Sequence, residues 1–142
     1  MQEEDVELRG VLLLRSRNEA LEALRWNPFY ARGLSQVAGV TRELARARPE
    51  FAPEAIRTYR VWAELQPGFW QPEMGLANAY LMSDQPQLAV EALDRVLAMT
   101  SDHNANTKAL RLQAVAYQQL GRQADAEAAD EAAQLLRADG RG

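Results

Sequence analysis

Leu76-Ala77-Asn78-Ala79-Tyr80 and Gln113-Ala114-Val115-Ala116-Tyr117 are two copies of one pattern, in which two alanines precede a tyrosine. Nine residues after each tyrosine comes an alanine, Ala89 in the first copy and Ala126 in the second. Both features are therefore offset by 37 residues. The pattern predicts two short amphipathic helices in each copy, joined by a tight turn. The turns fall at Ser83-Asp84-Gln85-Pro86 and at Leu120-Gly121-Arg122-Gln123.

A small residue recurs in the second helix of each predicted hairpin along the whole chain. It stands at Ala20, Ala55, Ala89 and Ala126, with offsets of 35, 34 and 37 residues. An alanine at this place lets two helices approach closely. A hairpin of this size cannot bury its apolar stripe alone, so the repeat predicts a solenoid of stacked hairpins. We expect one domain over residues 1–142, with about four hairpins over residues 3–28, 29–67, 70–100 and 104–138 and a frayed tail over 139–142.

This repeat resembles the tetratricopeptide repeat (TPR). The resemblance rests on Leu76, Ala77, Tyr80, Ala89, Leu93 and Leu97 in one copy and on Ala114, Tyr117, Gly121, Ala126 and Ala133 in the other. It implies an all-α fold, a right-handed superhelix of antiparallel hairpins. It also implies a non-enzymatic adaptor that binds a partner protein or peptide.

The resemblance also implies a concave groove lined by the first helix of each hairpin. Carried over by position, the groove residues are Arg32, Ser35, Gln36 and Arg42 in the second hairpin, Met74, Asn78 and Leu81 in the third, and Lys108, Arg111, Val115 and Gln118 in the fourth. A carboxamide such as that of Asn78 offers a peptide unit both a donor and an acceptor. Paired cations such as Lys108 and Arg111 suit a carboxylate, so an acidic partner segment is expected. The alternative is that these are ordinary solvated helix positions.

Composition excludes several classes of function. The 142 residues carry 16 basic and 20 acidic side chains, a net charge of −4, which argues against a general nucleic-acid binder. Lys108 is the only lysine. The chain has no cysteine, hence no disulfide and no thiolate metal site. Its start, Met1-Gln2-Glu3-Glu4-Asp5, is unlike a signal peptide, and Val11-Leu12-Leu13-Leu14 is too short to cross a bilayer, so we expect a cytoplasmic protein without direct membrane insertion.

No constellation of residues predicts catalysis, a metal or a cofactor. The single histidine, His103, lies in the predicted polar loop over residues 100–106 without a second soft ligand nearby. The acidic residues are scattered over solvated helix faces, and no glycine-rich loop could hold a phosphate. Trp26, Trp62 and Trp70 are interpreted as packing residues rather than as a ligand platform. The expected function is therefore binding, with no enzymatic activity.

Three hypotheses of function remain open from the sequence. The first is an adaptor that uses the groove or the open terminal helices, and the resemblance implies a setting in a bacterial envelope, secretion or polysaccharide-assembly complex. The second is a structural module that forms homo-oligomers through the apolar first helix and the Ala-rich last helix. The third is the soluble part of a subunit that is anchored in a membrane by a segment upstream of Met1.

Overall fold

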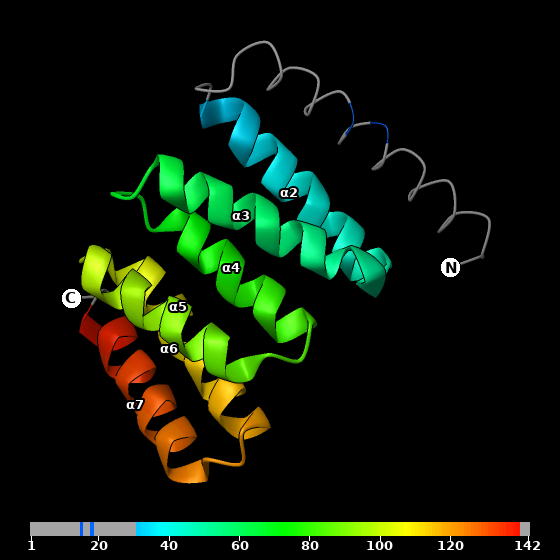
Figure 1. Cartoon of the computed structure of the whole chain (residues 1–142). Helices are drawn as coiled ribbons and strands as arrows, with labels where there is room; N and C mark the ends of the chain where they lie inside the picture. Colours follow the sequence, from blue (N-terminus) through cyan, green and yellow to red (C-terminus); the bar gives the residue numbers. More distant parts are fainter. Residues whose placement is uncertain (1–14, 16–17, 19–30, 140–142) are drawn as a thin grey trace.

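The computed structural model describes residues 31–139 together with Arg15 and Asn18. In this part the chain is all-α and consists of helices that follow one another in antiparallel succession (Figure 1). The elements are α2 (Ala31–Ala47), the short 3-10 helix η1 (Pro49–Phe51), α3 (Ala52–Leu65), α4 (Gln71–Met82), α5 (Pro86–Met99), α6 (His103–Gln119) and α7 (Gln123–Asp139). The hairpin predicted over residues 3–28 and most of the predicted tail lie outside the described residues.

The helices begin where the sequence supplies a start signal. Each of three helices has a proline at its first or second position: Pro53 in α3, Pro72 in α4 and Pro86 in α5. At these positions the missing N–H costs no hydrogen bond. Helix α6 begins with a side-chain cap, because Asp102 Oδ1 accepts hydrogen bonds from the backbone N–H groups of Asn104 and Ala105 at 2.9 and 3.4 Å. This start corrects one expectation. The polar loop predicted over residues 100–106 ends at Asp102, and His103 is the first residue of α6.

The turns inside the last two hairpins repeat the same backbone geometry. The N–H of Gln85 donates to the carbonyl of Tyr80 at 2.8 Å, and the N–H of Arg122 donates to that of Tyr117 at 2.9 Å. Each turn contains one residue with a positive φ: Asp84 at 57° in the first turn and Gly121 at 73° in the second. This is a Schellman ending, which satisfies carbonyls that the helix leaves unpaired. The repeat seen in the sequence therefore extends to the backbone hydrogen bonds.

Each helix packs against the next one along the chain, and α2 contacts α4 while α4 contacts α6. The first helices of the hairpins thus form one continuous layer, with α3, α5 and α7 as the second helices. Ala55, Ala89 and Ala126 are buried, with 0, 0 and 1% of their surface exposed. Their burial confirms the close helix contacts predicted for the recurring alanine, while Ala20 lies outside the described residues.

Helices α3 and α4 approach each other closely at Gly75. Gly75 on α4 lies against the ring of Tyr59 on α3, and a Cβ atom at position 75 would overlap that ring. Tyr59 is 3% exposed and belongs to the hydrophobic core. Polar links reinforce neighbouring helices at their edges: the guanidinium of Arg60 donates to Tyr80 Oη at 2.8 and 3.1 Å, and Gln113 Nε2 donates to Asp94 Oδ1 at 2.7 Å.

Candidate functional site

A cavity of about 260 Å³ opens where the layer of first helices meets the end of α3. We call it the groove. Its lining comes from four helices and from the residue that precedes α4: Ser35, Gly39 and Arg42 of α2, Tyr59 and Trp62 of α3, Trp70, Gln71, Met74, Gly75 and Asn78 at α4, and Lys108 of α6. Because three successive first helices contribute, the groove spans the stacked hairpins rather than belonging to one of them.

Aromatic side chains form one side of the groove. The rings of Tyr59 and Trp62 stack with their centroids 6.1 Å apart and their planes inclined by 25°. Trp62 is fixed further, because its Nε1 donates to Gln66 Oε1 at 2.6 Å. Trp70 is half-buried against the core and Met74 is buried. This side is therefore apolar and packed against the core, suited to an apolar side chain of a ligand.

The polar side of the groove offers both a donor and an acceptor. Arg42 Nε is buried and finds no hydrogen-bond acceptor in the part of the chain that the structure describes. Glu43 Oε1 lies 3.9 Å from it, beyond hydrogen-bond distance. Asn78 Nδ2 donates to the carbonyl of Met74 at 3.3 Å, which orients the amide and leaves its oxygen as an acceptor. The Arg42 side chain is 35% exposed, so atoms other than the buried Nε face the solvent. A guanidinium donor and the Asn78 oxygen complement the alternating C=O and N–H groups of a peptide backbone.

Burial raises the pKa of the Tyr59 phenol above its ordinary value of 10.0. The positive charges of Arg42 and Arg46 act in the opposite direction and are weaker than the effect of burial, while Glu43 adds to the rise. The phenol is therefore neutral at physiological pH. The groove consequently keeps its aromatic side uncharged next to the cations on its polar side.

Five of the predicted groove residues meet around this one cavity: Ser35, Arg42, Met74, Asn78 and Lys108. The others do not line it. Leu81 is half-buried against the core, whereas Gln36, Val115 and Gln118 are exposed elsewhere on their helices. Arg32 belongs to α2, but its side chain is outside the described part of the structure.

Sequence reasoning missed the aromatic part of the groove. From the sequence, Trp62 and Trp70 are interpreted as packing residues, yet both also line the cavity, as does the buried Tyr59. The available signal was their spacing. Tyr59 and Trp62 lie one turn apart at the end of a second helix, and Trp70 immediately precedes the next first helix.

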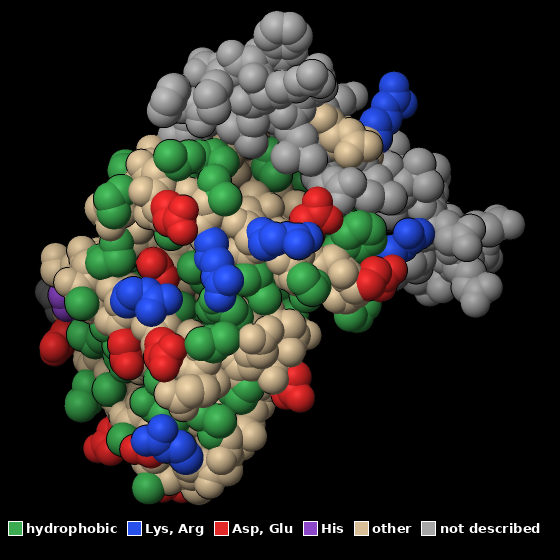
Figure 2. Space-filling view, viewed as in Figure 1, with side chains coloured by type: hydrophobic (Ala, Val, Ile, Leu, Met, Phe, Trp, Pro, Cys, Tyr) green, Lys and Arg blue, Asp and Glu red, His purple; other side chains and the backbone are tan. Residues whose placement is uncertain are grey.

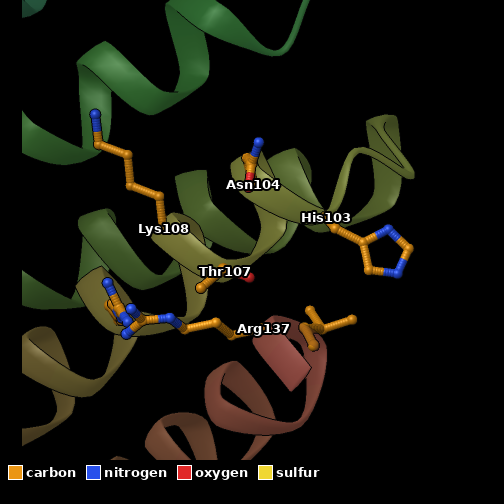
Figure 3. A pocket seen from close by; sticks show the side chains of 7 residues that line it. His103, Asn104, Thr107, Lys108 and Arg137 are labelled. Atoms are coloured by element: carbon orange, nitrogen blue, oxygen red, sulfur yellow. The ribbon is translucent and has the colours of Figure 1, made fainter. Parts of the chain in front are cut away.

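A second cavity, of about 630 Å³, lies between the start of α6 and the end of α7. We call it the edge pocket. Its lining is His103, Asn104, Thr107, Lys108 and Arg111 of α6 with Leu136 and Arg137 of α7. Figure 3 shows Arg137 extending from α7 along α6, while the ring of His103 points away from Lys108 and Arg137. Arg111, another predicted groove residue, therefore lies in this pocket, and Lys108 lines both cavities.

Comparison with known proteins identifies the fold. No model of a protein family matches the sequence, and no curated protein matches it. Among solved structures, the one named "MamA MSR-1 C2", a TPR-type protein, superposes with a TM-score of 0.76 at 14% sequence identity, over 94% of this chain and 72% of that one. The chain has a TPR-like fold. This confirms the fold predicted from the repeat.

The groove lies on the surface formed by successive first helices, whereas the edge pocket lies within one hairpin, between α6 and α7. In a solenoid each unit contacts only its neighbours, so the surface formed by successive first helices is extended and available for binding. Within the described residues no three His, Asp or Glu side chains come together in a way that could hold a metal ion. No helix of the described part is long and apolar enough to cross a bilayer.

Proposed function

We propose that this chain is a non-enzymatic interaction scaffold that binds an extended segment of a partner protein along the groove. The observation that carries the proposal is the meeting of Arg42, Met74, Asn78 and Lys108, from three successive first helices, around one cavity. The aromatic side receives an apolar side chain, while Arg42 and Asn78 pair with the peptide backbone. A TPR-like fold is typically a scaffold, and its partners are proteins or copies of itself.

Binding of a peptide to the groove is tested by selection from a displayed library of random peptides, followed by titration of the enriched sequences. Trp62 and Trp70 line the groove, so tryptophan emission should change on binding. Asn78→Ala and Arg42→Gln should each weaken binding about tenfold, the effect of one lost hydrogen bond in a desolvated site. The exposed Gln118→Ala is the matched control and should bind as the wild type does. If the wild type enriches no peptide, the proposal is wrong.

The proposal extends to the setting that the resemblance implies, a cytoplasmic component of a bacterial envelope, secretion or polysaccharide-assembly complex. A non-enzymatic scaffold contributes to such a complex by holding other proteins together. Copurification from the source cells, with mass spectrometry of the bound proteins, identifies the partner. Partners that belong to none of these systems would rule out the setting while leaving the groove untouched.

Self-assembly is the second candidate, and the exposed face of α7 favours it. Helix α7 packs chiefly on α6 and leaves Leu135 64% exposed. A second copy of the chain could cover this face. Light scattering over a range of concentrations separates the two candidates, because a molar mass that stays at that of one chain excludes the homo-oligomer.

A further inference from the structure

The charges around the groove decide which class of side chain it can hold. Among the described residues that line it are two cations, Arg42 and Lys108, and no carboxylate. Figure 2 shows a different pattern on the face in view, where acidic and basic side chains are intermingled. A lysine or arginine of a ligand is disfavoured in the groove, because it meets like charges with no acid to balance them. An acidic side chain is disfavoured against the aromatic rings, whose faces are negative.

The aromatic side chains of the groove offer flat apolar surfaces to an uncharged group. The rings of Tyr59 and Trp62 lie 6.1 Å apart with their planes inclined by 25°, and Trp70 lines the same cavity from the start of α4. The cavity volume of about 260 Å³ is below the range of about 300–1,000 Å³ typical of pockets that enclose a whole small ligand, so it suits one or two side chains. Proline rings pack against aromatic side chains in grooves of this kind.

The hydrogen-bonding groups of the groove favour a ligand backbone that has free carbonyl groups and few N–H groups. The guanidinium of Arg42 is a donor whose buried Nε has no acceptor among the described residues, and its side chain is 35% exposed. The oxygen of Asn78 is the acceptor that remains, because its Nδ2 already donates to the carbonyl of Met74. A polyproline II segment forms no internal hydrogen bonds, so its carbonyl groups are free, and its prolines have no N–H. A single non-proline residue supplies the one N–H that Asn78 can accept.

We propose that the groove binds a proline-containing segment of the partner in the polyproline II conformation. A proline ring lies against Trp62 and Trp70, and a neighbouring carbonyl group accepts a hydrogen bond from Arg42. The inference rests on the proposed function and names the class of peptide that the groove selects. Such a segment is close to its bound conformation before it binds, so little conformational entropy is lost. This matters for a small groove, because its volume limits the apolar area that a ligand can bury there.

Selection of displayed random peptides by the full chain tests this inference separately from the proposed function. Peptides enriched by the wild type should carry proline at a fixed position. In a synthetic form of the best peptide, leucine in place of that proline keeps an apolar side chain but loosens the backbone and adds an N–H, so binding should weaken about tenfold. Enrichment without a proline preference, or equal affinity of the two forms, would overturn the inference and leave the groove proposal standing. If the wild type enriches no peptide, both are wrong.

Substitution of one aromatic residue of the groove tests the inference from the side of the protein. Trp70→Leu keeps an apolar side chain and removes the aromatic face, so the best proline peptide should bind about five- to tenfold more weakly. Phe69→Leu is the matched control, because Phe69 is 50% exposed and does not line the groove, and its affinity should stay within twofold of the wild type. Thermal unfolding establishes that both variants are folded. Wild-type affinity in a folded Trp70→Leu contradicts the inference, and if that variant does not fold, the leucine form of the peptide decides on the wild type.

Discussion

Position 75 shows how a single hydrogen atom in place of a side chain sets the distance between two helices. A methyl group there would overlap the ring of Tyr59, which the surrounding core holds in place. Tyr59 in turn lines the groove beside Trp62. The shape of the candidate site therefore depends on a glycine in the interior of a helix, where glycine is otherwise unfavourable.

We expect Gly75→Ala to destabilise the protein by about 1–3 kcal/mol, since overpacking outweighs the gain of about 1 kcal/mol in helix propensity. The measurement is urea unfolding followed by circular dichroism. Gly39→Ala is the matched control on α2, because an added Cβ at position 39 meets nothing within 4 Å. It should stabilise the fold by about 0.5–1 kcal/mol. Equal effects at the two positions would contradict the close approach of α3 and α4.

The buried phenol of Tyr59 predicts a loss of stability in alkaline solution. Its pKa in the folded protein lies above the value of 10.0 that it has when unfolded. Below that pH both states keep the proton, whereas above it the unfolded state loses the proton first and is thereby stabilised relative to the folded state. The free energy of unfolding should thus fall above about pH 10. Urea titrations of wild type and Tyr59→Phe check this, and the fall should be smaller in the variant.

At the scale of elements, the two hairpin turns are equivalent in backbone geometry but carry different residues at the position of positive φ. Asp84 occupies it in the third hairpin and Gly121 in the fourth. An L-residue in this conformation is strained, aspartate less than most, while glycine adopts it freely. Replacing each of the two residues by the other type therefore measures the free-energy cost of a positive φ in this turn.

We expect Asp84→Gly to stabilise the protein by about 0.5–1 kcal/mol and Gly121→Asp to destabilise it by a similar amount. An added Cβ at position 121 meets nothing within 4 Å, so backbone strain alone carries the second effect. Thermal unfolding of the two single variants measures both changes. If the two substitutions shift the melting temperature in the same direction, the equivalence of the turns is wrong.

At the scale of the whole molecule, stacking leaves the hairpins unequally supported. The hairpin α4–α5 has α3 on one side and α6 on the other, whereas α7 packs chiefly on α6. Because each unit of a solenoid is stabilised by its neighbours, α7 should open more readily. Hydrogen exchange followed by mass spectrometry should show faster exchange in α7 than in α5. Equal protection of the two helices would mean that the described part opens as one cooperative unit.

The sequence predicted the parts of this structure that repeat. The copies that end in Tyr80 and Tyr117 gave the helices, their turns and the buried alanines, because periodic patterns express local structure directly. Arg42, Asn78 and Lys108 were placed together through the register that repeated units share. Residues that reach the candidate sites through packing between different hairpins could not be placed in this way.

Two residues of the candidate sites were not placed from the repeat. Trp62 reaches the groove from a second helix, where α3 lies close to α4. Arg137 reaches the edge pocket because the end of α7 folds back beside the start of α6. The placement of Trp62 depends on packing between two hairpins, whereas that of Arg137 follows from the antiparallel pairing of α6 and α7 within one hairpin. Both arise from packing between segments that are distant in the sequence.

The matching turns have a consequence for how such a chain can grow. The junctions after Gln85 and after Arg122 occupy the same point in the backbone hydrogen-bond pattern, 37 residues apart. A duplicate of residues 86–122 spliced in after Arg122 would start and finish in the same conformation. Unequal recombination within the gene could thus lengthen the protein by one such 37-residue segment in a single event, and the existing turn would serve as the new connection.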